Sequence, residues 1–439
     1  MKAINPSAAL RINGERSRTI KFYTLGCKVN QYETQLIREQ FHIAGFRELT
    51  NTLPAEICVI NTCTVTHRAD HSSLYLIRRI HRENPDARIV VTGCLAQFNA
   101  EEIARIPGVS LIVRNENKSR IISLLENSSK TQEAGKEGIT YFQGHSRVFL
   151  KVQDGCNYCC SYCKVRMARG ISISRPIDDI KEEVKALVGN GYLEIVICGI
   201  CLGSYGKDLI PGLSLSRLVD ELEGIKGAFR IRLSSIEPKD INEQLIGVLA
   251  NSKRLCQHLH IPVQSGDDRI LKRMNRPYLR EWYIKIIEQI RGRIPDMAIT
   301  TDVMIGFPGE TEEKFRNTVD LIKKIKPLRV HIFPYSRRLN TPAYNFEGVR
   351  LSGDKIKSRA AGLEKVSRAM RSLYCQRFIA RDADVLIEKL VSGYPDLWEG
   401  YTGNYIKVRV MSRQRLENRI IKAKLTKIYR DFVLADIVG

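Results

Sequence analysis

Residues 155 to 163 read Gly155-Cys156-Asn157-Tyr158-Cys159-Cys160-Ser161-Tyr162-Cys163, which places four cysteines in eight residues after a strand-like run at 148–153. Cys156, Cys160 and Cys163 have the spacing Cys-x3-Cys-x2-Cys, which brings three thiolates close enough to hold three corners of one iron-sulfur cubane. Because four ligands fill such a cluster, the fourth iron would be left to bind something other than protein. Cys159 breaks the spacing, and we interpret it as a bystander.

The length of the chain favours several domains, and its net charge favours a polyanionic partner. The 439 residues leave room for two to four domains, and 70 Lys and Arg against 48 Asp and Glu give a formal net charge of +22. This excess favours an RNA or DNA partner, with solubility or an anionic membrane surface as alternatives. The sequence has no apolar run near the roughly 18 to 20 residues of a membrane span and no secretory signal pattern. We expect no membrane partner and a cytoplasmic location, where the twelve cysteines are reduced and available for metal.

Residues 18–127 alternate short apolar runs with amphipathic segments, which predicts a small open α/β domain with a mostly parallel sheet. Three of its strands are followed by Cys27, Cys63 and Cys94. Because ligands bind beyond the carboxyl ends of such strands, we expect the three thiols to converge on a second cluster. The alternative is three small buried residues, since free cysteine packs well in cores. Cys58 lies within a strand, and we interpret it as a core residue. The expected strands are residues 20–25, 57–60, 88–92 and 110–113.

Residues 128–145 are rich in Ser, Lys, Glu and Gly and predict a linker. Strand and helix signals then alternate about six times within residues 146–345, which predicts a partial (βα)6 barrel with its site at the carboxyl ends of the strands. The cysteine loop follows the first strand, where this rule places the chemistry. The expected strands are residues 148–153, 193–199, 229–234, 256–263, 298–306 and 329–334, and the expected helices include residues 178–187, 215–222, 282–291 and 312–325.

The last part of the chain predicts a basic connecting helix at residues 346–376 and a β domain at residues 377–439. Period-two alternation in residues 405–410 and 421–425 places apolar and basic residues on opposite faces. A small β-barrel with a basic surface is a common structure for binding nucleic acid. A merely solvated polar face is the alternative.

These features together resemble the radical S-adenosylmethionine methylthiotransferases, from about Thr19 to the end of the chain. The cysteine loop with its surroundings, Asp154-Gly155-Cys156-Asn157 and Ala168-Arg169-Gly170, is similar to this family, and so are the three N-terminal cysteines. The C-terminal β segment is similar to the family's RNA-binding TRAM domain. The fold class implied is α/β, with an N-terminal open α/β domain, a central partial (βα)6 radical SAM barrel and a small C-terminal TRAM-like β-barrel.

Within the family, Gly26-Cys27-Lys28-Val29-Asn30-Gln31-Tyr32-Glu33-Thr34 is most similar to the branch that acts on N6-threonylcarbamoyladenosine at position 37 of tRNA. The isopentenyladenosine and ribosomal-protein branches usually carry Asp-Ser-Glu where this chain has Tyr-Glu-Thr. The resemblance implies an enzyme that adds a methylthio group to C2 of that nucleoside in the anticodon stem-loop. The alternative substrates are isopentenyladenosine tRNA and a ribosomal-protein aspartate. A non-catalytic iron-sulfur protein that binds nucleic acid is more remote, because structural metal sites are normally closed by four protein ligands.

The resemblance also implies two [4Fe-4S] clusters and S-adenosylmethionine as cofactors. The open iron of the first cluster would bind S-adenosylmethionine and, once reduced by a donor such as a flavodoxin or ferredoxin, cleave it to a 5'-deoxyadenosyl radical. The second cluster would carry or donate sulfur. Candidate contacts to S-adenosylmethionine are Glu237, Gln264 and Gly199, although Glu237 and Gln264 could equally be ordinary turn residues. The implied cluster ligands are Cys156, Cys160 and Cys163 for the first cluster, and Cys27, Cys63 and Cys94 for the second.

The sequence departs from the family pattern near these motifs. Arg166-Met167 stands where the family usually has a Pro-Tyr pair, Cys159 adds a thiol, and Cys201 stands where a polar residue is usual. Asn340 replaces an expected Gly, and Asn tolerates left-handed backbone better than most residues. These departures lie beside the expected cofactor site and leave the prediction of the cluster ligands unchanged.

Two further pairs invite a metal interpretation. Cys198 and Cys201 form a Cys-x2-Cys pair without a second pair at zinc spacing, which favours core packing. His258 and His260 lie on one face of a strand. No carboxylate follows at close spacing, which disfavours a metal role for the two histidines.

Overall fold

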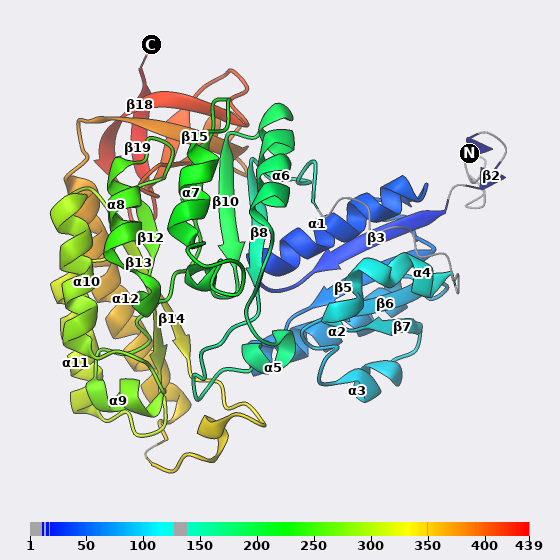
Figure 1. Ribbon diagram of the computed structural model, residues 1–439, viewed down its shortest axis with the longest axis horizontal. Helices are drawn as coiled ribbons and strands as arrows, with labels where there is room; N and C mark the ends of the chain where they lie inside the picture. The colour runs from blue at the N-terminus through cyan, green and yellow to red at the C-terminus, as the bar shows by residue number, and fades with distance from the viewer. Residues whose placement is uncertain (1–10, 13–14, 17, 127–137, 349, 439) are drawn as a thin grey trace. The chain divides into compact units, whose positions relative to one another are not determined.

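The computed structural model divides into two compact units (Figure 1). Unit 1 is Met1–Ile139 together with Met167–Arg169, and unit 2 is Thr140–Arg166 together with Gly170–Gly439. Most of the predicted linker, residues 128–137, lies outside the described residues. The structure describes residues 11–12, 15–16, 18–126, 138–348 and 350–438.

Unit 1 is built on a parallel sheet with helices on both faces. In strand β5 (Ile57–Thr62), Ile57 and Val59 pack into the core formed with α1 and α4, whereas Cys58 and Ile60 pack into the core formed with α2 and α3. Cys58 is fully buried, which confirms its interpretation as a core residue. A parallel sheet covered on both faces requires continuously apolar strands, and this explains why the sequence predicted the sheet.

The four predicted strands of this sheet are confirmed, and the short edge strand β4 was not predicted. The order is β4-β3-β5-β6-β7. The elements of unit 1 are the pair β1 (Arg11–Ile12) and β2 (Glu15–Arg16), then β3 (Thr19–Thr24), α1 (Lys28–Ile43), β4 (Arg47–Glu48), β5, α2 (His67–Glu83), β6 (Arg88–Gly93), α3 (Ala100–Ala104), β7 (Val109–Val113), η1 (Asn115–Arg120) and α4 (Ile121–Leu125).

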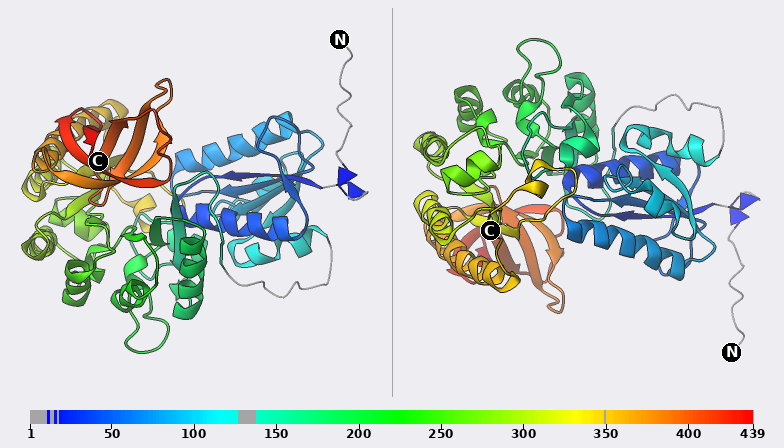
Figure 2. Two further views of the ribbon diagram at one scale, coloured as in Figure 1. Left: turned by 90° about the horizontal axis from the view of Figure 1, so that it is seen from above. Right: turned by 90° about the horizontal axis from the view of Figure 1, so that it is seen from below.

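Unit 2 contains the six predicted parallel strands in the order β8-β10-β11 and β12-β13-β14. Isolated bridges, such as Ser235 with His260, join the two sheets into one partial barrel. The helices lie outside the strands (Figure 2). The strands are β8 (Arg147–Asp154), β10 (Glu194–Gly199), β11 (Arg230–Leu233), β12 (His258–His260), β13 (Ala298–Ile305) and β14 (Arg329–Pro334), with the short antiparallel β9 (Ile173–Ser174) beside β8.

The helices of unit 2 follow the predicted pattern, and α11 has the predicted bounds. They are α5 (Val165–Arg169, whose last three residues belong to unit 1), α6 (Ile177–Gly189), α7 (Leu215–Glu223), α8 (Glu243–Asn251), α9 (Asp268–Arg273), α10 (Arg280–Arg293), α11 (Glu312–Ile325) and α12 (Gly353–Gln376). In the described part of the chain, no helix combines the length and the apolar character needed to cross a membrane.

The C-terminal segment forms the predicted small β-barrel, which is closed in the order β15-β16-β17-β19-β18. Val408 and Val410 face its core, while Lys407 and Arg409 lie on the outer face of the same strand. The core continues into Tyr374 of α12, so the barrel packs as part of unit 2. The barrel strands are β15 (Asp382–Leu390), β16 (Leu397–Thr402), β17 (Lys407–Met411), β18 (Arg419–Ile428) and β19 (Val433–Ile437).

Two arginines that form buried ion pairs in the partial barrel also hydrogen-bond the small C-terminal barrel. Glu194 is fully buried and bonds Arg230 at 2.6 Å and Arg232 at 2.7 Å. Arg230 donates to the carbonyl of Tyr401, and Arg232 to that of Gly403, both in the small barrel. Burial alone would raise the pKa of Glu194, but these two arginines lower the pKa to about 2. Glu194 is therefore an ionised carboxylate that positions the two arginines connecting the partial barrel to the small barrel.

We expect Glu194→Gln to destabilise unit 2 strongly. Removing one partner of a buried ion pair leaves uncompensated charge and typically costs about 3–5 kcal/mol, here on Arg230 and Arg232. Differential scanning calorimetry should show a lower unfolding midpoint. The matched control is Glu221→Gln, which removes a partly exposed partner of Lys181 and should change the midpoint much less. Equal midpoints for the two variants would contradict this assignment.

Candidate active site

The cysteine loop begins at a sharp turn that only glycine can form. Gly155 has a φ of +68°, and a Cβ on it would lie 1.8 Å from the carbonyl oxygen of Ile171. The amide of Cys156 donates to the carbonyl of Gly170 at 3.1 Å. The chain therefore leaves β8 and presents the cysteines beyond the carboxyl end of the first strand, as predicted.

A buried glutamine, Gln153, holds the start of the cysteine loop through hydrogen bonds. The side-chain amide of Gln153 donates to the carbonyls of Asp154 at 2.6 Å and Gly155 at 2.8 Å, and its oxygen accepts from the backbone amide of Cys201 at 2.8 Å. A Cβ on Gly199 would lie 2.7 Å from the same glutamine oxygen. Gly199 thus makes room for the supporting amide, and its contact with a cofactor stays a prediction.

The three predicted ligands of the first cluster share this loop. The Sγ of Cys160 accepts from Arg276 at 3.3 Å, and the Sγ of Cys163 accepts from the amide of Val165 at 3.4 Å. Burial raises the pKa of Cys163 to about 12, whereas a hydrogen bond from the thiol of Cys201 lowers the pKa of Cys156 to about 7.

The three thiols of the loop can each bind one iron of an iron-sulfur cluster. Within the described ranges, no three or more His, Cys, Asp or Glu side chains lie close enough to hold one metal ion. In a cubane each thiolate binds a different iron, so the sulfurs need not converge on one point. The donor set of the loop therefore fits a [4Fe-4S] cluster.

The two extra thiols near the loop have different surroundings. Cys159 is exposed and accepts a hydrogen bond from Arg166, which agrees with its interpretation as a bystander. Cys201 is buried, as predicted, and so is Cys198. However, Cys201 also lies against Cys156 and hydrogen-bonds Ser204 at 3.2 Å. Sequence spacing gave no sign of this neighbour, because 45 positions separate the two cysteines in the chain.

Arg276 is a site residue that sequence reasoning missed. Its guanidinium is buried and contacts the carboxylate of Glu237, the hydroxyl of Tyr278 at 2.8 Å and the sulfur of Cys160. Burial raises the pKa of Glu237, and the guanidinium opposes this shift. Glu237 also directly precedes the 3-10 turn η3 (Pro238–Asp240), so it is a turn residue, which was the alternative interpretation of this position. Arg276 follows a left-handed Asn275, and no motif marks it.

Two buried polar atoms near the carboxyl ends of the strands lack hydrogen-bond partners. These are the Oε1 of Gln264 and the Oγ of Ser234, among the residues that the structure describes. Gln264 also has a φ of +69°, a strained conformation for a residue other than glycine. Strain and unsatisfied polar atoms are typical of ligand sites, so this region fits a polar cofactor such as S-adenosylmethionine.

The three N-terminal cysteines come together at the carboxyl ends of β3, β5 and β6. A Cβ on Gly26 would lie 3.2 Å from the sulfur of Cys63. Burial raises the pKa of Cys63 to about 11, and the nearby thiols of Cys94 and Cys27 add to the shift. Cys27 is exposed, while the other two are buried. The thiols thus have the predicted placement, and their role as ligands stays a prediction.

The remaining predicted features have structural explanations. One ring nitrogen of His258 and one of His260 hydrogen-bond the hydroxyl of Thr300 at 2.9 Å, so each ring has a protein partner. Asn340 has a φ of +68°, so it does take the left-handed position where the family pattern has glycine.

A partial barrel of six parallel strands with a three-cysteine loop after the first strand defines the class of radical S-adenosylmethionine enzymes. Residues 150–322 match the Radical SAM superfamily, and residues 19–114 match a family described as uncharacterized protein family UPF0004. The fold is similar to the methyltransferase TsrM from Kitasatospora setae (TM-score 0.54, 15% identity, covering 74% of this chain and 77% of that chain).

Two relatives narrow the class. The threonylcarbamoyladenosine tRNA methylthiotransferase MtaB of Bacillus subtilis is 36% identical over 93% of this chain and 94% of its own. The tRNA-2-methylthio-N(6)-dimethylallyladenosine synthase of Clostridium tetani is 32% identical over 95% of this chain and 96% of its own. The chain therefore belongs to the radical SAM methylthiotransferase family. The family uses S-adenosylmethionine together with an iron-sulfur cluster as cofactors.

Proposed function

We propose that this enzyme adds a methylthio group to C2 of N6-threonylcarbamoyladenosine at position 37 of tRNA. The observation that carries the proposal is the 36% identity, over nearly the whole chain, to a relative named for this nucleoside. The relative named for the dimethylallyl nucleoside is less similar, at 32%. The enzyme would act in the cytoplasm on the anticodon stem-loop, with a flavodoxin or ferredoxin as the electron donor.

The cofactors supply an electron, a 5'-deoxyadenosyl radical and sulfur; the chain binds and orients them. Radical chemistry suits C2 of adenine because this carbon resists polar substitution at neutral pH. We assign Cys156, Cys160 and Cys163 to the first cluster and Cys27, Cys63 and Cys94 to the second.

Side chains around the first cluster would orient S-adenosylmethionine. Arg276 places a buried positive charge beside the sulfur of Cys160 and fixes Glu237. Gln264 and Ser234 offer unsatisfied polar atoms at the strand ends, where S-adenosylmethionine would bind. Gly199 leaves space for Gln153, which holds the loop in position.

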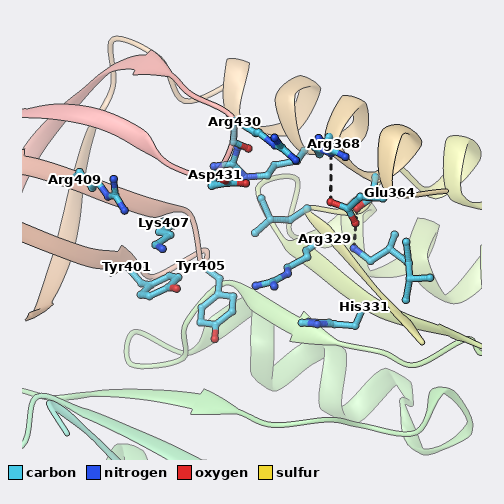
Figure 3. A pocket seen from close by; sticks show the side chains of 15 residues that line it. Arg329, His331, Glu364, Arg368, Tyr401, Tyr405, Lys407, Arg409, Arg430 and Asp431 are labelled. Atoms are coloured by element: carbon cyan, nitrogen blue, oxygen red, sulfur yellow. Dashed lines mark hydrogen bonds and ion pairs between the residues drawn. The ribbon is translucent and has the colours of Figure 1, made fainter. Parts of the chain in front are cut away.

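A basic and aromatic cleft on unit 2 is suited to RNA (Figure 3). It has a volume of about 620 Å³ and lies between β14 with α12 on one side and the small barrel on the other. Arg329 and His331 line one side, and Tyr401, Tyr405 and Lys407 line the other. The rings of the two tyrosines stack with centroids 5.0 Å apart. Cations beside stacked rings suit phosphates and unpaired bases, so we assign this cleft to the tRNA.

We expect Arg329→Gln to weaken tRNA binding and its salt dependence. Each lost phosphate contact should reduce the slope of log K against log salt concentration by about 0.7–0.9. Arg329 is exposed, so its replacement should leave the fold intact. The matched control is Arg217→Gln on α7, which removes the same charge outside the cleft. Filter binding at several salt concentrations compares the two. Equal slopes would contradict the assignment of the cleft.

The substrate is tested with purified, reconstituted enzyme and two tRNAs that differ only at position 37. We expect methylthiolation of the tRNA that carries threonylcarbamoyladenosine and little or none of the tRNA that carries isopentenyladenosine, as measured by nucleoside mass spectrometry. The reverse preference would refute the proposed substrate and favour the alternative branch.

A further inference from the structure

Three charged side chains meet in the interior of unit 1. Glu33 lies on α1, Lys118 on η1 and Arg169 at the end of α5. The ammonium of Lys118 contacts one carboxylate oxygen of Glu33, and Arg169 contacts both oxygens, at 2.8 Å and 3.1 Å. The exposed fractions of these side chains are 9% for Lys118, 7% for Glu33 and 1% for Arg169. Burying three charges is costly, so their presence requires an explanation.

These three charged side chains lie close to the three N-terminal cysteines. Arg169 donates to the Oδ1 of Asn30 at 2.5 Å, and the same oxygen lies 3.9 Å from the Sγ of Cys27. Lys118 also donates to Asn61 at 3.4 Å, two residues before Cys63. Burial lowers the pKa of Lys118, and the charge of Arg169 lowers it further, whereas the carboxylate of Glu33 and the thiol of Cys94 raise it.

The three charges do not cancel. Lys118 and Arg169 are positive and Glu33 is negative, so the group carries one net positive charge. Asp70 is an opposing group: its negative charge raises the pKa of Cys63, and its carboxylate accepts from Thr64 at 2.6 Å. Asp70 is partly exposed, so solvent screens it more than the buried group.

A group that only supported the fold would not need a net positive charge. One lysine would balance the charge of Glu33; the second cation, Arg169, hydrogen-bonds Glu33 and Asn30 and also adds a positive charge that no carboxylate of the group cancels. Three thiolates leave one iron of a cluster open, and a positive charge beneath that cluster favours an anionic ligand there over a neutral one.

We propose that Lys118 and Arg169, held in place by Glu33, form a fixed positive charge that favours an anionic sulfur ligand of the hydrosulfide class at the second cluster. This inference rests on the proposed function, because it assumes a cluster on Cys27, Cys63 and Cys94. Lys118 and Arg169 are positioning residues, since they act on the ligand through the electrostatic field and make no bond to it.

The test uses the full chain with Cys156, Cys160 and Cys163 all replaced by alanine, so that only the second cluster is reconstituted. Sodium hydrosulfide is titrated, and binding is followed by electron paramagnetic resonance of the reduced cluster. Lys118→Met removes one unit charge yet leaves Glu33 paired with Arg169. It should weaken hydrosulfide binding on the order of tenfold, the change expected for one charge roughly 10 Å away at an effective dielectric constant near 20.

Two further variants separate charge from packing. Lys118→Arg keeps the charge and should restore affinity to within about twofold of the parent, whereas Glu33→Gln raises the net charge and should tighten binding. If Lys118→Met fails to hold iron, Glu33→Gln decides the outcome: tighter binding supports the proposal and unchanged binding overturns it. Unchanged affinity in a Lys118→Met variant that holds about four irons would also overturn it. A parent chain without iron would instead count against the second cluster itself.

Discussion

A chain carrying Cys160→Ala should hold about four irons instead of about eight and should lose both cleavage of S-adenosylmethionine and methylthiolation of tRNA. Cys160 is one of the three thiolates that we assign to the first cluster, and its sulfur accepts a hydrogen bond from the buried Arg276. With two thiolates left, the loop cannot hold the cluster that generates the radical. Iron assays after anaerobic reconstitution and chromatography for 5'-deoxyadenosine measure both losses.

Cys159→Ala is the matched control for this experiment. Cys159 is the adjacent residue in the same loop, is exposed, and lies outside the Cys-x3-Cys-x2-Cys spacing. This variant should keep about eight irons and most of the activity. If Cys159→Ala lost the cluster and Cys160→Ala kept it, the choice of ligands in the loop would be wrong.

Cys27→Ala should also reduce iron to about four per chain, but with a different loss of activity. The first cluster remains, so S-adenosylmethionine should still be cleaved to 5'-deoxyadenosine when a reductant is supplied. Methylthiolation should disappear because the second cluster no longer supplies sulfur. Cys27 is exposed at the start of α1, so its replacement should not disturb the core.

Cys58→Ala is the control in the same unit. Cys58 is fully buried on β5, on the face that packs against α2, and it should affect stability rather than iron content. The assignment of the N-terminal site would fail if the parent chain held about four irons and Cys27→Ala left that number unchanged.

The helices and strands with a clear local pattern of apolar residues could be predicted from the sequence. Continuous apolar runs gave the strands of unit 1, and 3.6-residue periodicity gave α11 with its observed bounds. The placement of the cysteines followed from one rule, that ligands bind beyond the carboxyl ends of parallel strands. Cys27, Cys63 and Cys94 lie far apart in the chain, and the parallel register of β3, β5 and β6 brings them together.

Contacts between distant charged residues could not be predicted. No sequence motif marks Lys118 or Arg276, and their partners Glu33 and Glu237 lie 85 and 39 positions away in the chain. The predicted strand at residues 256–263 is reduced to His258–His260: the amide of His258 turns back to the carbonyl of Cys256 at its start, and Gln264 adopts a left-handed conformation beyond its end. Such departures from local preference concentrate at functional sites, and Gln264 is one of the residues assigned to the cofactor.

Mass spectrometry of tRNA nucleosides from cells that lack this gene tests whether the enzyme methylthiolates threonylcarbamoyladenosine at position 37. We expect 2-methylthio-N6-threonylcarbamoyladenosine to disappear and its unmodified precursor to accumulate, and we expect the intact gene, but not a Cys160→Ala copy, to restore the product. Unchanged 2-methylthio-N6-threonylcarbamoyladenosine, with loss of the methylthio derivative of isopentenyladenosine instead, would contradict this expectation.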